Sequence, residues 1–142
     1  MASATPRLRV EGACQELGRG EVVQRCLHLL AGGSADPDFL ITLGGPAAMH
    51  LLNDGVPDQQ AYWLRVWAAR GLLWVGPGKD IGLLRTALND DAWRVREMLC
   101  KVVARHRVGD LLDDVADLES DPIQRVRAAA ARAAVSIVQA GA

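Results

Sequence analysis

The sequence has few of the residues that mark many functional classes. It contains 142 residues, with one phenylalanine, one tyrosine and three cysteines, and its formal net charge at pH 7 is −1. This near-neutral balance removes any attraction of the whole molecule to nucleic acid or to an anionic membrane, so such binding would need local segregation of charge. Cys14, Cys26 and Cys100 form no close pair, which excludes the common zinc and redox motifs. Reduced and mostly buried thiols are expected.

Long apolar runs are absent as well. No stretch reaches the roughly eighteen consecutive apolar residues that a membrane-spanning helix needs. The opening segment MASATPRLRVEGACQ has two arginines, but no apolar run follows them, so no secretory signal is visible. We expect a cytoplasmic protein that does not bind membranes. At this length, residues 1–142 should form a single domain around one core.

The signatures of catalysis are also missing. His28, His50 and His106 show no spacing suited to a metal site or to a nucleophile relay. The stretch GPGKD at 76–80 lacks the spacing and the following Ser or Thr of a phosphate-binding loop. The acidic stretch at 110–121 lacks the pattern of a calcium loop and is expected to be a solvated outer face. We therefore expect no enzymatic activity, no cofactor and no metal.

What the sequence does contain is a repeat. The dipeptide Val-Arg at 95–96 recurs 31 residues later at 126–127, and Leu-Arg stands 31 residues earlier at 64–65. Around each dipeptide the apolar residues follow the three-and-four spacing of one helix face. This spacing predicts three long helices, beginning near residues 61, 92 and 123, whose apolar faces form the core.

Shorter helices are predicted before the long ones. The segments PAAMHLLND, DIGLLRTALND and VGDLLDDVADLES begin at residues 46, 80 and 108. The Asp-Pro dipeptides at 36–37 and 121–122 are good helix starts, because Asp caps free amides and Pro has no N–H to satisfy. The predicted unit is a short helix, a tight turn and a long helix, repeated three times over 46–142. Residues 1–45 would form a divergent cap of the stack, in which GEVVQRCLHLLAGG and DPDFLITLGG make a degenerate fourth pair.

The repeat resembles the HEAT repeats, in particular the short HEAT-like repeats of phycobilisome lyases and many bacterial proteins. The units LNDDAWRVREMLCKVVA and LESDPIQRVRAAAARAAV carry the resemblance: Leu, a polar turn with Asp, Val-Arg, then small apolar residues. It implies an all-α fold, a right-handed α-solenoid of stacked antiparallel helix pairs. It also implies that Arg65, Arg96 and Arg127 reach the turn aspartates Asp90, Asp91 and Asp121, so these arginines are expected to be structural.

A column of cations that is separate from Arg65, Arg96 and Arg127 is the candidate binding site. Stepping 100° per residue places two tryptophans and six cations in register on one flank of the long helices. The predicted partner-binding residues are Trp63, Arg70, Trp74, Arg94, Lys101, Arg105, Arg125 and Arg132. Such a surface suits an acidic partner protein, whose carboxylates pair with Arg and Lys. A protein-interaction or scaffold module is therefore predicted, and the rival interpretation is a face charged only for solubility.

Two other functions fit the same resemblance. DNA-alkylation-repeat glycosylases are also stacks of HEAT-like helices with a cationic face, so a nucleic-acid-binding protein is one alternative. A helper subunit of the lyase type is another. The C-terminal segment VRAAAARAAVSIVQAGA lacks the polar outer face of a capping helix, which predicts self-association or docking through this end.

Overall fold

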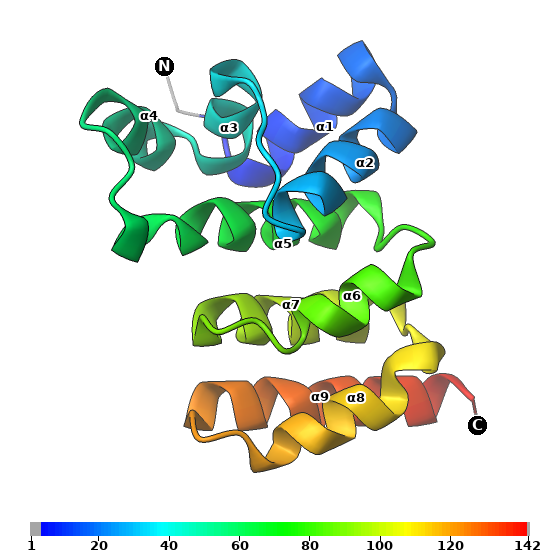
Figure 1. The fold of residues 1–142 in the computed structure, drawn as a ribbon. Helices are drawn as coiled ribbons and strands as arrows, with labels where there is room; N and C mark the ends of the chain where they lie inside the picture. Colours follow the sequence, from blue (N-terminus) through cyan, green and yellow to red (C-terminus); the bar gives the residue numbers. More distant parts are fainter. Residues whose placement is uncertain (1–3, 142) are drawn as a thin grey trace. The chain divides into compact units, whose positions relative to one another are not determined.

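The computed structural model describes residues 4–141, and within them the protein is all-α, as predicted (Figure 1). No strand occurs in these residues, and none of their helices is long and apolar enough to cross a membrane. The α-helices are α1 (Pro6–Leu17), α2 (Arg19–Leu30), α3 (Pro37–Gly44), α4 (Pro46–Asn53), α5 (Tyr62–Val75), α6 (Ile81–Ala87), α7 (Trp93–His106), α8 (Leu112–Asp117) and α9 (Gln124–Ala140). Three single turns of 3-10 helix, η1 (Asp58–Gln60), η2 (Gly109–Leu111) and η3 (Leu118–Ser120), flank α5 and α8.

The chain divides into two compact units, one ending at Val75 and one beginning at Gly76. Unit 1 contains α1 to α5, and unit 2 contains α6 to α9. The boundary follows the first of the three predicted long helices. The segment from Gly76 to Asp80 that opens unit 2 contains Pro77 and two glycines with positive φ, Gly76 at 108° and Gly78 at 78°, which favour a turn over helix continuation.

Helix starts follow the sequence signals in part. Asp36 caps α3 as predicted, because its carboxylate accepts a hydrogen bond of 2.9 Å from the amide of Phe39. The second Asp-Pro pair behaves differently. Asp121 accepts from the amide of Ile123, and α9 begins only at Gln124. Asp121 therefore closes the turn before α9 and is not its N-cap; the capping prediction is wrong at this position.

In unit 1, α5 is the central helix, and it packs against α1, α2 and α3. The predicted pairing of the 46–54 helix with α5 is not the main packing, since α4 packs chiefly against α3. Helix α1 was not predicted as a helix. Gly71 permits the close packing, because a Cβ there would lie 3.2 Å from both Cys26 Sγ and Leu43 Cδ2.

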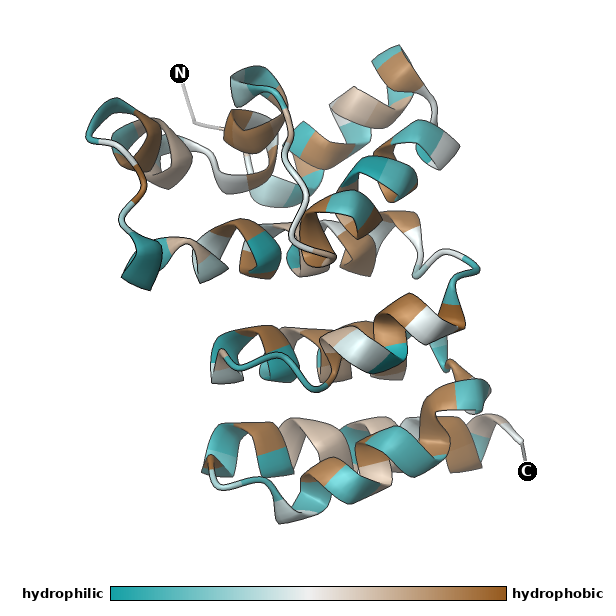
Figure 2. Cartoon of the chain, viewed as in Figure 1, coloured by the Kyte–Doolittle hydropathy of each residue, from teal (hydrophilic) through white to brown (hydrophobic). Residues whose placement is uncertain are grey.

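Unit 2 follows the predicted pattern more closely. Helices α7 and α9 pack side by side, with α6 against α7 and α8 against α9 (Figure 1). The three-and-four spacing is confirmed, since the buried residues of α7 include Val95, Leu99 and Val102, and those of α9 include Val126 and Ala129. Figure 2 shows hydrophobic and hydrophilic residues alternating along these helices, as burial of one side requires.

Trp67 is the largest buried side chain of α5, with 6% of its surface exposed. Replacing it with Ala should lower the free energy of unfolding by about 3–5 kcal/mol, because the removed ring leaves a cavity. Urea unfolding followed by circular dichroism measures this loss. Trp74 is a matched control in the same helix with a partly exposed ring. Equal losses for Trp67→Ala and Trp74→Ala would show that burial of Trp67 does not stabilise unit 1.

Candidate functional site

The turn arginines of unit 2 are held as predicted. Arg96 binds the carboxylate of Asp121 in a bidentate manner, with Nε to Oδ2 at 2.8 Å and Nη2 to Oδ1 at 3.2 Å. Its Nη1 also donates to the backbone oxygen of Asp90 at 2.8 Å, and Arg127 Nη1 donates in the same way to the backbone oxygen of Asp121. The bond from an arginine Nη1 to a backbone oxygen of the preceding turn thus occurs twice, 31 residues apart. The structural interpretation is confirmed for Arg96 and Arg127.

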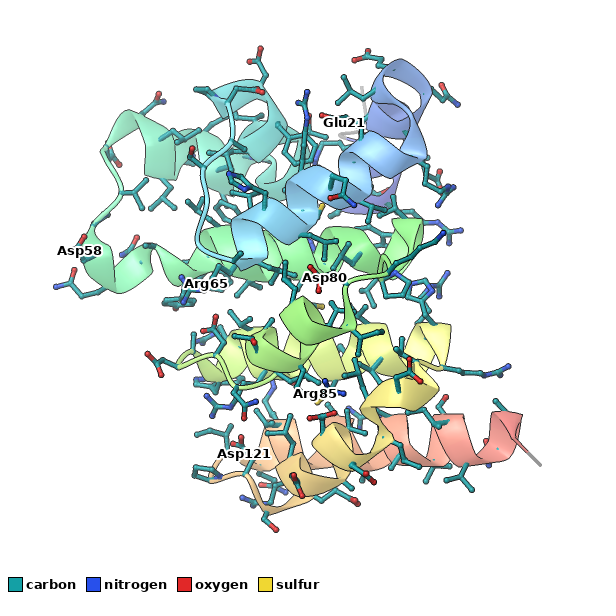
Figure 3. All side chains as sticks on the ribbon, turned by 45° about the vertical axis from the view of Figure 1, so that its right-hand side comes forward. Glu21, Asp58, Arg65, Asp80, Arg85 and Asp121 are labelled. Carbon is teal, nitrogen blue, oxygen red and sulfur yellow. The ribbon has the colours of Figure 1, made fainter. Side chains whose placement is uncertain are left out.

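Asp121 is buried, and burial, hydrogen bonds and nearby charges all act on the pKa of its carboxyl. Burial alone would raise the pKa of this carboxyl. The hydrogen bonds from Arg96 and from the amide of Ile123, together with the charges of Arg96 and Arg127, outweigh burial, so the pKa lies below its usual value. The carboxylate is therefore ionised in the folded protein and neutralised by guanidinium groups. Figure 3 shows its place at the turn before α9.

Five of the predicted binding residues lie on α7 and α9: Arg94, Lys101, Arg105, Arg125 and Arg132. We call this set the α7–α9 cationic face. Two of its members meet on one ring, because Cζ of Arg94 lies 4.4 Å and Cζ of Arg125 lies 5.1 Å from the centroid of Trp93. The residues 31 apart in sequence therefore come together, as the repeat predicts.

Glu97 is the residue that the sequence analysis missed at this face. It is 7% exposed, and its carboxylate accepts two hydrogen bonds from Arg125, at 2.8 Å from Nε and 3.1 Å from Nη2. A signal was available, because Glu97 stands one helical turn after Trp93 and Arg94 on α7. The Trp93 indole, the Glu97 carboxylate and the Arg125 guanidinium thus lie in contact at the amino end of α7.

The other cations of the face differ from Arg125. Within residues 4–141, Lys101, Arg105 and Arg132 form no ion pair with a carboxylate, and Arg105 and Arg132 are exposed. Burial is the main reason that the pKa of the Cys100 thiol on α7 is raised to about 12. The charges of Asp121 and Glu97 also raise this pKa, and the charges of Arg132 and Arg96 act in the opposite direction. Cys100 is therefore an inert core thiol.

The remaining predicted residues, Trp63, Arg70 and Trp74, belong to α5 in unit 1. Arg70 is half-buried, and its Nη2 donates to the backbone oxygen of Leu43 at 2.8 Å. Burial lowers the pKa of Arg70, and the charge of Arg9 lowers it further. Because Arg70 satisfies the carboxyl end of α3, its arrangement is that of a structural residue. The backbone oxygen of Trp74 accepts from Arg19 at 3.1 Å.

Trp63 lines a pocket in unit 1 that the sequence analysis did not predict. The pocket has a volume of about 500 Å³. Its walls are Ala47, His50, Leu51, Asp54, Gly55, Pro57, Gln60, Trp63 and Trp67. No pattern in the sequence indicated it, because these residues come together only through the position of α4.

The acidic stretch is exposed along most of its length. Asp114 is partly buried and accepts from Arg85 of α6 at 3.2 Å. Asp121 is buried, unlike the solvated outer face expected for the whole stretch. No group of three or more metal-ligating side chains occurs in the described part of the chain.

Helix α9 exposes two large apolar residues. Val135 is 53% and Val138 is 60% exposed. Both belong to the C-terminal segment for which self-association is predicted. Self-association through this segment stays a prediction.

Comparisons of the chain with protein-family models, with curated proteins and with solved structures give no match.

The Arg96–Asp121 pair gives a pH-dependent prediction. Asp121→Asn should lower the free energy of unfolding by about 2 kcal/mol at pH 7, because a buried charge-assisted bond is lost. Since folding lowers the pKa of Asp121, its carboxylate stabilises the fold above the unfolded pKa, and this stabilisation is lost as the pH falls through the folded pKa. Urea unfolding at several pH values should show the difference shrinking below about pH 4.

Asp117→Asn is the matched control, because Asp117 is exposed at the end of α8. It should change stability by less than about 0.5 kcal/mol at any pH. A loss for Asp121→Asn that stays constant down to pH 2 would contradict the electrostatic role of Asp121.

Proposed function

We propose that the protein is a non-enzymatic, HEAT-like interaction module that binds an acidic segment of a partner protein through the α7–α9 cationic face. The observation that carries the proposal is the set Lys101, Arg105 and Arg132. In the described residues these cations have no carboxylate partner, whereas Arg85, Arg96 and Arg125 of the same unit each have one. An acidic partner would supply the missing carboxylates.

The packing of unit 2 supports the HEAT-like part of the proposal. Successive short and long helices lie in pairs, and the long helices α7 and α9 stack on each other. The bond from each arginine to the backbone of the preceding turn, six residues earlier, is the same in both repeats. A repeated side chain that makes a repeated bond is a sign of stacked equivalent units.

The face has a fixed part and an adaptable part. At one end, Trp93 and Glu97 hold Arg125 in a defined position, so little entropy is lost when a partner binds there. Toward the other end, Lys101, Arg105 and Arg132 are long side chains that can adjust to carboxylates at several spacings. From Arg94 to Arg105 the helix rises about 16 Å, which is the length of a short peptide segment.

Nucleic acid would satisfy the same cations with phosphate oxygens. The acidic side chains of α8, in the same unit, and the net charge of −1 favour a protein partner, because nucleic-acid binding gains most from an excess of positive charge. A nucleic-acid ligand is therefore an outcome that the experiment must be able to detect.

The test compares two double charge reversals. Lys101→Glu with Arg132→Glu alters the face, and Lys79→Glu with Arg107→Glu makes the same charge change at exposed positions outside α7 and α9. The probe is a fluorescein-labelled 12-residue peptide of alternating Glu and Ser, and its anisotropy is measured at low and physiological salt. We expect the face variant to weaken binding roughly tenfold, and the turn variant less than threefold.

Three results would contradict the proposal. One is equal binding of the peptide by both variants, which would mean that the face is charged only for solubility. Another is equal binding of a control peptide in which Gln replaces Glu. The third is a pull-down from lysate in which nuclease removes every retained protein, since this would favour a nucleic-acid ligand. Circular dichroism checks that both variants fold.

A further inference from the structure

Unit 2 carries an acidic surface as well as the α7–α9 cationic face. Its carboxylates lie on η2, α8 and η3, and all of them are exposed: Asp110, Asp113, Asp117 and Glu119. We call this set the α8 acidic surface. Among the residues that the structure describes, none of the four forms an ion pair, whereas Asp114 of the same helix is paired with Arg85. Like charges that are gathered in this way favour an approaching cationic surface.

The charges of the two surfaces have the same spacing. Lys101 and Arg105 stand one helical turn apart on α7, a rise of about 6 Å. Asp113 and Asp117 also stand one helical turn apart, on α8. Two neighbouring cations can therefore meet two neighbouring carboxylates in one register, and Arg132 of α9 adds a third cation to the face.

The two surfaces do not pair with each other within one copy of the chain. Helix α8 packs on α9, yet in the described part of unit 2 no α8 carboxylate forms an ion pair with Lys101, Arg105 or Arg132 (Figure 1). Each copy therefore presents one unpaired surface of each charge. A second copy would supply the missing partner of both.

The apolar residues beside these charges suit the same arrangement. Val135 is 53% exposed and borders, together with Arg132, a hollow on the surface of α9. On α8 the exposed Ala116 shares one helix face with Asp113 and Asp117. Contact between α8 and α9 of two copies would thus cover apolar groups as well as pair charges.

A symmetric pairing of two α9 helices lacks this complementarity. Helix α9 contains three arginines and no acidic residue. Two copies that met through α9 alone would bring like charges together. Charge therefore favours contact between different surfaces of the two copies.

We propose that the α7–α9 cationic face of one copy binds the α8 acidic surface of a second copy, head to tail. The inference rests on the proposed function, because it names the acidic partner that the same cations bind. A contact between two different surfaces leaves one surface open at each end, so further copies can add in a row or close a ring. Exposed ion pairs are individually weak, so the association is weak and depends on salt.

Analytical ultracentrifugation of the full chain measures this association. At about 0.2 mM protein in about 10 mM NaCl, where the Debye length is about 30 Å, we expect a weight-average mass at least roughly twice that of one chain. In about 1 M NaCl, where the Debye length is about 3 Å, the mass should fall to that of one chain. Dilution at low salt should have the same effect, because the contact is between molecules.

Two variants each remove one of the surfaces. The face variant is Lys101→Gln with Arg132→Gln, and the α8 variant is Asp113→Asn with Asp117→Asn. Alone, each should sediment as a single chain, because the contact needs both surfaces. Mixed in equal amounts, they should form a dimer with one copy of each and nothing larger, because only one intact surface of each charge remains.

Asp54→Asn with Asp58→Asn is the matched control for the α8 variant. It removes the same charge from two exposed positions in unit 1. This control should associate as the unchanged chain does, so a general effect of net charge is separated from the α8 acidic surface. Circular dichroism checks that every variant folds.

Each contrary result overturns the second copy as partner. A single chain at about 0.2 mM in low salt would exclude it directly. An α8 variant that still associates alone would place the contact elsewhere, as in a symmetric pairing of α9. A mixture that forms no dimer would show that the two surfaces do not bind each other. Binding of the Glu–Ser peptide by a chain that stays single would contradict this inference alone, whereas absence of peptide binding would contradict the proposed function.

Discussion

The bidentate bond between Arg96 and Asp121 fixes the register of α7 on α9. It connects the first turn of α7 to the turn that leads into α9, and the same guanidinium also holds the backbone of Asp90. With both helix starts fixed by one side chain, residues 31 apart lie next to each other. The meeting of Arg94 and Arg125 on Trp93, and the nearness of Arg132 to Cys100, both follow from this register.

A similar sequence pattern packs differently in the two units. In unit 2 the short helix before α9 covers it, whereas in unit 1 the short helix α4 turns to α3, and α5 is covered by α1 and α2. Two local features favour the covering of α5 by α1 and α2 in place of α4. Gly44 and Gly71 remove side chains where α3 and α2 approach α5, and Trp67 fills the space beside Gly44. Because α4 packs on α3 and does not cover α5, a pocket remains between α4 and α5.

The sequence predicted the parts of the fold that depend on one helix at a time. Periodicity placed the long helices and most of their buried residues, and the resemblance to HEAT repeats implied that Arg96 and Arg127 bind the turn before their own helix. Helix α1 was missed because its apolar residues are few and its helical state depends on packing against α2, α3 and α5. The pocket was missed because it depends on which helix α4 contacts, a choice that no local pattern records.

The members of the predicted cationic column differ from one another in the structure. Of the six cations placed on one flank, Arg70 satisfies a backbone oxygen and Arg125 satisfies Glu97, so the column is not uniformly available to a partner. Helical angles cannot tell a solvated guanidinium from one that caps another helix, because the difference lies in the neighbouring element. The same reasoning applies to the carboxylates, because Glu97 and Asp121 are buried where they neutralise arginines of their own unit. In the described part of unit 2, Arg85, Arg96 and Arg125 have a carboxylate partner, whereas Lys101, Arg105 and Arg132 have none.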